Sequence, residues 1–400
     1  MIHVAGGTYL EFCREPYWHE LYGSGLRASL TLNKLDVSVC FSTFVGKEQK
    51  SVLAAKAVGI KLSDTETSDT VLFSYLHPLS KPTIEPDIFV RGCQQHPNVI
   101  NVEADNVLRF GVVEGSAKVK ARMATYDPQT PSDPRPFTEN GSVAERLAVV
   151  ANRIEAKRLT GQPTPEKACQ TILNQGAEVA IVKCGTAGCV VATAARISRV
   201  PAYRTNRVWP IGSGDVFSAL FAHGWMELGL DPVEAATVAS KGTSHYVETQ
   251  LLPQKNDLER TTFQPLRHLP PDKFKKIYLA GPFFNLPQRW LIEEFKDALA
   301  NAGVQVFSPL HDVGRGSADD VYAPDIEGLK TCPVVLACLD GLDPGTIYEV
   351  GYAHSLGAKV IAFVSAERME DLKMVIGGGS QISNDFATAL YLTVWAATCE

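Results

Sequence analysis

The stretch PVVLACLDGLDPGTIYEVGYAHSLGAKVIAFV, from Pro333 to Val364, predicts the fold of the C-terminal part of this chain. Two apolar runs, Val334–Leu339 and Val360–Val364, have the length and composition of buried strands. The residues between them, Gly345–Leu356, have the pattern of a helix that Gly357 would end. A strand, a helix and a second strand in this order predict a parallel βαβ unit, in which ligands bind beyond the carboxyl ends of the strands.

Acidic residues gather around the start of this helix. Asp343 occupies the position of an N-cap ahead of Pro344, and Asp340 and Glu349 lie close by in the sequence. Three carboxylates near one helix N-terminus repel each other unless something uses them, although the helix dipole can keep one or two of them ionised. Cleavage of an N-glycosidic bond suits such a cluster. One carboxylate attacks or shields the anomeric carbon, and another handles the proton of the leaving base.

Four separated blocks, in order over about the last third of the chain, resemble the nucleoside 2-deoxyribosyltransferase family. They are IYLAGPFFN (Ile277–Asn285), Ser308-Pro309, Asp325 within APDIEGLK, and DPGTIYEVGYA (Asp343–Ala353). The resemblance implies that Glu349 is the nucleophile, that Asp325 and Asp343 bind the base and manage its proton, and that Tyr278 orients the nucleophile. It also implies substrate contacts at Gly281, Pro282, Phe283 and Gly345, no cofactor for this half, and a homo-oligomer in which a neighbouring chain completes the pocket.

Simpler interpretations of the same residues stay open. Glu349 could be a solvated residue of an amphipathic helix, Asp343 could be only an N-cap, and Tyr278 could belong to a core or an interface. In the polar stretch His311–Asp320, Arg315, Gly316 and Ser317 could hold a phosphate or ribose, or could form a surface loop.

The composition bounds the class of protein. The chain has 400 residues, 45% of them hydrophobic and 20% charged, which predicts two or three globular domains. A net charge of −6 argues against a nucleic-acid partner, and no apolar run has the ~20 residues of a membrane span. Nine scattered cysteines without a CxxC pair favour reduced thiols, and a start without a basic segment favours a cytoplasmic location.

The first 250 residues alternate apolar runs with helical patterns, so they also predict an α/β fold. Within them Gly212, Ser213, Gly214 and Asp215 precede a helical segment expected to run from Val216 to Leu228. Glycines at a helix start let backbone N–H groups approach a phosphate. An aspartate directly after them can accept the proton of a hydroxyl that attacks that phosphate.

Together with NRIE, LTG and VKCGTAG, this motif resembles the PfkB, or ribokinase-like, sugar and nucleoside kinases. The resemblance implies that Asp215 is the general base and that Gly212, Ser213 and Gly214 form the anion hole. It implies ATP and Mg²⁺ as cofactors; the implied contacts are Lys183, Gly185 and Gly188 to the nucleotide, Asn152 and Glu155 to Mg²⁺ indirectly, and Glu11, Gly23 and Gly25 to the sugar.

The sequence departs from the kinase pattern mainly on the sugar side. Trp209-Pro210 replaces the usual Asp-Thr, Glu11 replaces the sugar-binding aspartate, and Arg27 lies at the position of the asparagine that follows the N-terminal glycine pair. The phosphate machinery is therefore better preserved than the sugar pocket. An active kinase and a degenerate nucleotide-binding or scaffold module remain equal alternatives.

We therefore expect two α/β domains: a ribokinase-like sandwich over 1–250 and a flavodoxin-like, Rossmann-type parallel sheet over 275–400, joined by a proline-containing linker over 251–274. The expected protein is an enzyme that cleaves an N-glycosidic bond by deoxyribosyl transfer or hydrolysis, with an ATP-binding kinase-like half. One alternative is an NAD or nucleotide glycohydrolase, of toxin or phage-defence type, that a degenerate kinase-like sensor controls. A nucleotide-responsive assembly scaffold is another.

Overall fold

A computed structural model describes residues 1–86, 98–129, 133–260 and 262–400. Internal contacts divide the chain into two compact units, Met1–Pro265 (unit 1) and Leu266–Glu400 (unit 2). The division falls inside the proline-containing stretch 251–274, whose first part forms α7 (Lys255–Arg260) against α6 (Pro232–Thr249) of unit 1. Among the helices described, none combines the length and the apolar character needed to cross a membrane.

Unit 1 contains a nine-stranded sheet, in the order β13-β12-β11-β10-β9-β8-β1-β4-β5, that is parallel except where β12 pairs with β11 and β13. Its strands are β1 (Ile2–Ala5), β4 (Val39–Gly46), β5 (Lys61–Thr67), β8 (Val99–Phe110), β9 (Ser116–Asp127), β10 (Val143–Asn152), β11 (Val179–Lys183), β12 (Cys189–Ala192) and β13 (Ile197–Val200). A four-stranded sheet, in the order β3-β2-β6-β7, contains β2 (Leu10–Cys13), β3 (Trp18–Leu21), β6 (Leu72–Tyr75) and β7 (Thr83–Glu85).

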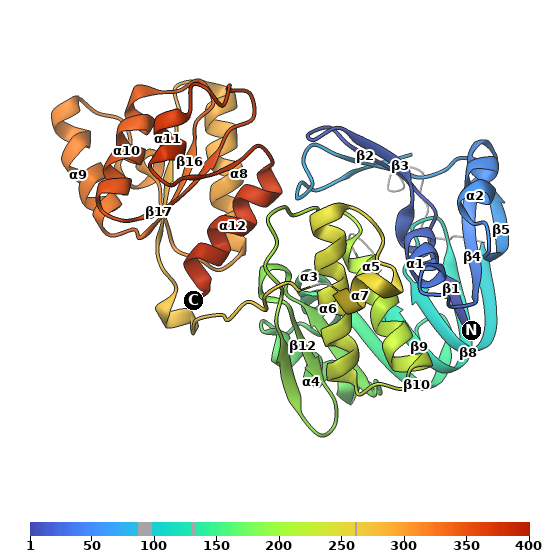
Figure 1. Cartoon of the computed structure of the whole chain (residues 1–400). Helices are drawn as coiled ribbons and strands as arrows, with labels where there is room; N and C mark the ends of the chain where they lie inside the picture. The colour runs from blue at the N-terminus through green and yellow to red at the C-terminus, as the bar shows by residue number, and fades with distance from the viewer. Residues whose placement is uncertain (87–97, 130–132, 261) are drawn as a thin grey trace. The chain divides into compact units, whose positions relative to one another are not determined.

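Helices cover both faces of the large sheet (Figure 1). Alternate residues of β11 enter different cores, because successive side chains of a strand point to opposite faces. Val179 and Ile181 share a core with α1 (Gly23–Asn33), α2 (Lys50–Lys56), α5 (Ser213–Ala222) and α6, whereas Ala180 and Val182 share one with α3 (Arg153–Thr160) and α4 (Pro165–Asn174). This arrangement confirms the predicted ribokinase-like α/β sandwich.

Unit 2 is an all-parallel, five-stranded sheet in the order β15-β14-β16-β17-β18. Its strands are β14 (Ile277–Ala280), β15 (Val306–Phe307), β16 (Val334–Cys338), β17 (Lys359–Phe363) and β18 (Gln381–Ser383), and its helices are α8 (Leu286–Asn301), α9 (Ala318–Lys330), α10 (Pro344–Ser355), α11 (Lys373–Gly377) and α12 (Phe386–Thr398). The second strand of the unit lies outside the first and the third on its other side, which confirms the flavodoxin-like fold. The order reverses between β14 and β16, and ligands of such sheets bind at that point, beyond the carboxyl ends of the strands.

Capping residues set the starts of two helices in unit 2. α8 begins at Leu286, since Asn285 and Gln288 form a capping box. α9 begins at Ala318, since Ser317 and Asp320 do the same, so the end of the stretch His311–Asp320 is helix and not loop. The helix expected over 216–228 begins at Ser213 and changes at His223–Glu227 into a π-helical turn.

Candidate functional site

A tyrosine and a glutamate meet at the strand-order reversal of unit 2. Tyr278 belongs to β14 and is fully buried, and Glu349 lies in the second turn of α10, which packs against β14 and β16. The Tyr278 hydroxyl donates a hydrogen bond of 2.6 Å to Oε1 of Glu349. Burial and the charge of Glu349 raise the pKa of Tyr278, so this hydroxyl remains a donor throughout the physiological range.

The surroundings of Glu349 are acidic. Burial raises the pKa of Glu349 to about 7, the hydrogen bond from Tyr278 opposes that rise, and the charges of Asp325 and Asp343 add to it. Burial also raises the pKa of Asp325, whose Oδ1 is buried and accepts no hydrogen bond from any group described. Within the described part of the chain, no cationic side chain forms an ion pair with Glu349 or Asp325. Two carboxylates with raised pKa values therefore lie near each other in unit 2.

The structure separates the other two acidic residues of this region. Asp343 is the N-cap of α10, as predicted, and its Oδ2 accepts hydrogen bonds from the backbone N–H (2.8 Å) and the hydroxyl (2.9 Å) of Thr346. Asp340 instead accepts hydrogen bonds from the backbone N–H groups of Ser365 (2.7 Å) and Ala366 (3.1 Å). Asp343 therefore remains electrostatically linked to Glu349, and Asp340 has a local structural role.

The connection from β14 to α8 contains the predicted substrate contacts Gly281, Pro282 and Phe283. A Cβ atom on Gly281 would lie 2.8 Å from the side chain of Ile292 and 3.0 Å from that of Cys338, so the close packing of this connection requires glycine. Gly345 lies in the first turn of α10, where a Cβ atom would be 3.0 Å from Oδ2 of Asp343. These residues follow the carboxyl end of β14 or begin the helix that carries Glu349.

In unit 1 the carboxylate of Asp215 is part of a buried ion-pair network. Asp215 lies in the first turn of α5, and its Oδ2 accepts a 2.7 Å hydrogen bond from Arg27. The same guanidinium pairs with both oxygens of Glu11, whose Oε1 also accepts a 3.0 Å hydrogen bond from the backbone of Gly23. Arg27 is fully buried and its pKa is raised by Glu11 and Asp215 against the effect of burial, so it keeps its charge.

A second buried pair lies on the side of unit 1 where the resemblance implies the nucleotide. Lys183, at the end of β11, pairs with Asp127, at the end of β9, and the hydroxyl of Ser218 donates a 2.7 Å hydrogen bond to the same oxygen of Asp127. A Cβ atom on Gly214 would lie 3.2 Å from Nζ of Lys183, so the amine lies beside the start of α5. Despite burial, the charges of Asp127 and Glu155 raise the pKa of Lys183.

Of the remaining predicted nucleotide contacts, Gly185 and Gly188 are turn residues. Gly185 begins the 3₁₀ turn Gly185–Ala187 after β11, and Gly188 ends it; both have positive φ, of 58° and 76°. Ser213 is the first residue of α5. On the sugar side, a Cβ atom on Gly25 would lie 2.6 Å from the backbone of Gly6. Backbone geometry therefore accounts for Gly185, Gly188 and Gly25. The ligand contacts that the resemblance implies would be a second reason for these glycines.

Asn152 and Glu155, the residues implied to act on Mg²⁺, form a capping box at the start of α3. The Asn152 side chain accepts hydrogen bonds from Ile154 and Glu155, and Oε2 of Glu155 accepts one of 2.8 Å from the backbone of Asn152. Burial and the charge of Asp127 raise the pKa of Glu155 to about 7. Over the described residues, no three histidine, cysteine or acidic side chains are grouped as metal ligands. The acidic pair Asp127 and Glu155 fits a hard cation held through water, since Oδ1 of Asp127 is buried without a hydrogen-bond partner among the described groups.

Two family models match the chain, one in each unit. Residues 277–384 match nucleoside 2-deoxyribosyltransferase, and residues 143–252 match the pfkB family carbohydrate kinase. The chain is a fusion of a PfkB kinase-like unit and a deoxyribosyltransferase-like unit. Both matched families are families of transferases.

Individual relatives are distant. An uncharacterised protein of Ureaplasma parvum serovar 3 is 33% identical over an alignment 91 residues long, which covers 19% of this chain and 58% of that protein. Among solved structures, fructokinase from Vibrio cholerae O395 with fructose, ADP and calcium has a TM-score of 0.49 at 16% identity and covers 65% of this chain and 99% of its own. Ribokinase from Thermotoga maritima has a TM-score of 0.45 at 15% identity and covers 65% and 98%.

The two family matches cover the predicted sites unequally. The match in the deoxyribosyltransferase-like unit includes all its predicted site residues, from Tyr278 to Glu349. The match in the kinase-like unit begins after Asp127, so it includes the nucleotide side and Asp215 but not Glu11 or Arg27.

Several polar residues near the predicted sites of the two units were not found from the sequence. Asp127 and Ser218 were not among the predicted residues, although Asp127 could have been found as an acidic residue at the end of a buried strand. Gln129, whose amide donates to Oδ1 of Asp215, gave no signal. In the deoxyribosyltransferase-like unit, the hydroxyls of Tyr322 in α9 and Tyr348 in α10 lie 3.1 Å apart, a contact that the sequence did not reveal.

Proposed function

We propose that unit 2 cleaves the N-glycosidic bond of a nucleoside, nucleotide or NAD through Glu349. The observation that supports this best is the 2.6 Å hydrogen bond between Tyr278 and a glutamate that has no cationic partner among the described residues. An ionised Glu349 oxygen attacks the anomeric carbon, the carbon–nitrogen bond breaks, and its electron pair leaves with the base. Tyr278 fixes the orientation of the carboxylate that reacts.

The leaving base needs a proton, and Asp325 is the group suited to supply it. Burial raises its pKa, which is the direction that a general acid requires, and its Oδ1 accepts no hydrogen bond from any group described. Asp343, which already caps α10, would contact the base or tune Glu349 by its charge. The glycosyl ester on Glu349 then passes the sugar either to a second base or to water.

For unit 1 we propose ATP binding. Lys183, Gly185 and Gly188 would contact the nucleotide, and Gly212, Ser213 and Gly214 would hold its phosphates at the start of α5. Mg²⁺, which neutralises phosphate charge in such kinases, would be held through water by Glu155, which Asn152 positions at the start of α3, and by Asp127. We also propose that the two domains span 1–250 and 275–400 and are joined by a linker over 251–274. We further propose that the chain forms a homo-oligomer.

The test of unit 2 is chromatography of free bases. The full chain is incubated with deoxynucleosides, nucleotides and NAD, each with and without a second base such as adenine. Transfer predicts a new deoxynucleoside only when the second base is present. Glu349→Ala should form neither a free base nor a new deoxynucleoside. Failure of the wild-type chain to release a base from any of these substrates would refute the proposal and favour a scaffold.

A second candidate is an NAD or nucleotide glycohydrolase that a kinase-like sensor controls. The ion pair between Arg27 and Asp215 favours it, because a neutralised base suits a sensor better than a kinase. In the same experiment this function predicts free nicotinamide without any base exchange.

A further inference from the structure

The guanidinium of Arg27 lies where the implied general base of unit 1 would meet its acceptor. The side chain comes from α1, is fully buried, and pairs with Glu11 from β2 and Asp215 from α5. A general base must come within about 2.6–3.2 Å of the proton that it removes. Nη1 of Arg27 lies 2.7 Å from Oδ2 of Asp215, which is the distance an acceptor hydroxyl would need.

The second oxygen of Asp215 is also engaged. The side-chain amide of Gln129 donates a hydrogen bond to Oδ1, and the Asp215 side chain is only 8% exposed. A sugar hydroxyl would therefore have to compete with Arg27 and Gln129 for this carboxylate. Displacement of Arg27 would also leave two buried carboxylates, Glu11 and Asp215, without their cation.

The backbone around Arg27 is adapted to it. A Cβ atom on Gly212 would lie 2.2 Å from both Cζ and Nε of Arg27, so the first glycine of the phosphate motif is required for the close approach of the guanidinium. The ring of Tyr22, the residue before α1, lies 4.6 Å from Cζ of Arg27. Gly212, at the start of α5, and Tyr22, before α1, therefore both lie against the guanidinium of Arg27.

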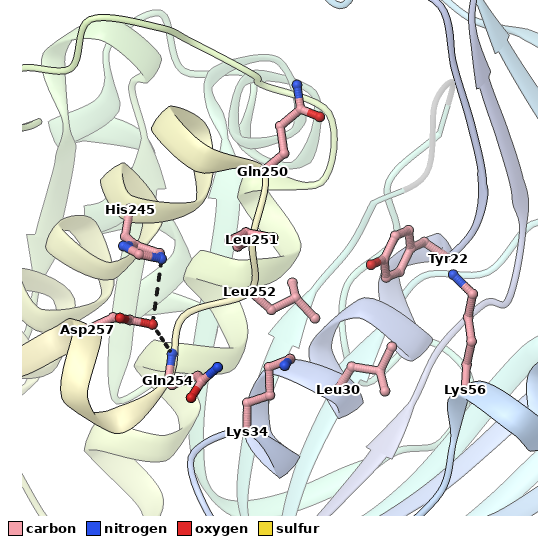
Figure 2. A pocket seen from close by; sticks show the side chains of 10 residues that line it. All are labelled: Tyr22, Leu30, Lys34, Lys56, His245, Gln250, Leu251, Leu252, Gln254 and Asp257. Atoms are coloured by element: carbon pink, nitrogen blue, oxygen red, sulfur yellow. Dashed lines mark hydrogen bonds and ion pairs between the residues drawn. The ribbon is translucent and has the colours of Figure 1, made fainter.

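The cavity next to this region has a lining of its own. Tyr22 also lines a cavity of about 380 Å³, together with Leu30, Lys34, Lys56 and Leu252, as Figure 2 shows. Neither Arg27 nor Asp215 is among its lining residues. Tyr22 therefore contacts the guanidinium while lining this separate space.

We infer that Arg27 is an internal occupant of the acceptor site, so that unit 1 binds a nucleoside triphosphate without transferring its phosphoryl group to a sugar or nucleoside. The inference rests on the ATP binding proposed above and restricts it. On the phosphate side, Lys183 lies beside Gly214 and pairs with Asp127, so a bound phosphate would compete with Asp127 for its amine. Unit 1 is then a nucleotide-responsive module, and the chemistry of the chain belongs to unit 2.

The experiment uses the full chain carrying Glu349→Gln, so that unit 2 does not consume nucleosides. Binding of Mg·ATP is measured by isothermal titration calorimetry, and transfer of γ-³²P to pentoses, hexoses, inositol and nucleosides is followed by thin-layer chromatography. A crystal structure with a non-hydrolysable ATP analogue shows the position of Arg27. We expect ATP to bind, Arg27 to remain paired with Asp215, and no acceptor to become labelled.

Results that contradict the inference about Arg27 can be distinguished from results that contradict ATP binding. A labelled acceptor that Asp215→Asn abolishes, or an analogue complex in which Arg27 has left Asp215, overturns the inference and leaves the proposed ATP binding intact. A chain that binds no ATP at micromolar to millimolar concentration overturns both. Base release by the wild-type chain is independent of these outcomes and reports only on unit 2.

Discussion

Asp215 and Glu349 are both carboxylates near the start of a helix in an α/β unit, but they face opposite charges. The oxygens of Asp215 accept hydrogen bonds from Arg27 and Gln129, whereas Glu349 accepts one from a neutral tyrosine and lies near two other carboxylates. A motif determines where a carboxylate lies. The groups that face it determine whether it can act as a base or nucleophile.

The largest effect should come from replacing Glu349. If it is the nucleophile, Glu349→Gln should lower base release by at least about 10³-fold, since the remaining groups bind substrate but cannot form the covalent intermediate. Chromatographic initial rates measure the loss. The matched control is Glu370→Gln, an exposed residue paired with Lys373, which should keep full activity. Equal losses in both variants would refute a role for Glu349.

The same variant separates lost chemistry from lost folding. The pKa of Glu349 rises from its usual value near 4.5 to about 7 in the folded chain, so the folded state binds the proton more tightly than the unfolded state. Its contribution to stability therefore decreases as the pH rises through this window. At pH 8, Glu349→Gln should melt at the same temperature as the wild type or at a higher one.

In unit 1 the largest effect should be on stability. Arg27→Ala leaves Glu11 and Asp215 buried without a cation, which should cost about 3–5 kcal/mol of the free energy of unfolding of this unit. Calorimetry of the full chain measures it as a lower melting transition of unit 1. Arg199→Ala, which breaks the exposed pair with Glu166, should cost about 0–1 kcal/mol. Similar costs for the two variants would contradict the role of Arg27 as a buried counter-ion.

These residues also show how far the sequence could be read. Strand and helix patterns predicted both folds, and local motifs located Glu349, Asp343 and Asp215. The ion pair between Arg27 and Asp215 could not be predicted, because 188 residues separate its partners and only the folded sheet brings α1 beside α5. For the same reason Asp340 seemed to belong to the acidic cluster, whereas it binds the backbone after β17.

A smaller effect is expected from Tyr278→Phe. The phenol hydrogen bond lowers the pKa of Glu349, so its removal should raise that pKa above about 7. The acid limb of the rate–pH profile should move to higher pH, and the rate at pH 7 should fall about 10–100-fold through misorientation and lost ionisation. Tyr391→Phe is the control, because Tyr391 is a tyrosine of α12 outside this hydrogen bond. An unchanged acid limb would show that Tyr278 serves packing alone.

The smallest effect should decide whether Asp343 is only a cap. Asparagine caps helices about as well as aspartate, so Asp343→Asn should change stability by less than about 0.5 kcal/mol, whereas Asp343→Ala should lose about 1 kcal/mol with the bonds to Thr346. Removing the charge near Glu349 should also move the acid limb slightly to lower pH, because that charge raises the pKa of Glu349. If Asp343 contacts the base, Asp343→Asn should lower kcat/KM about tenfold although the helix remains capped. Full activity in Asp343→Asn, together with a loss in Asp343→Ala that follows its lower stability, would make this residue a cap and leave proton transfer to Asp325.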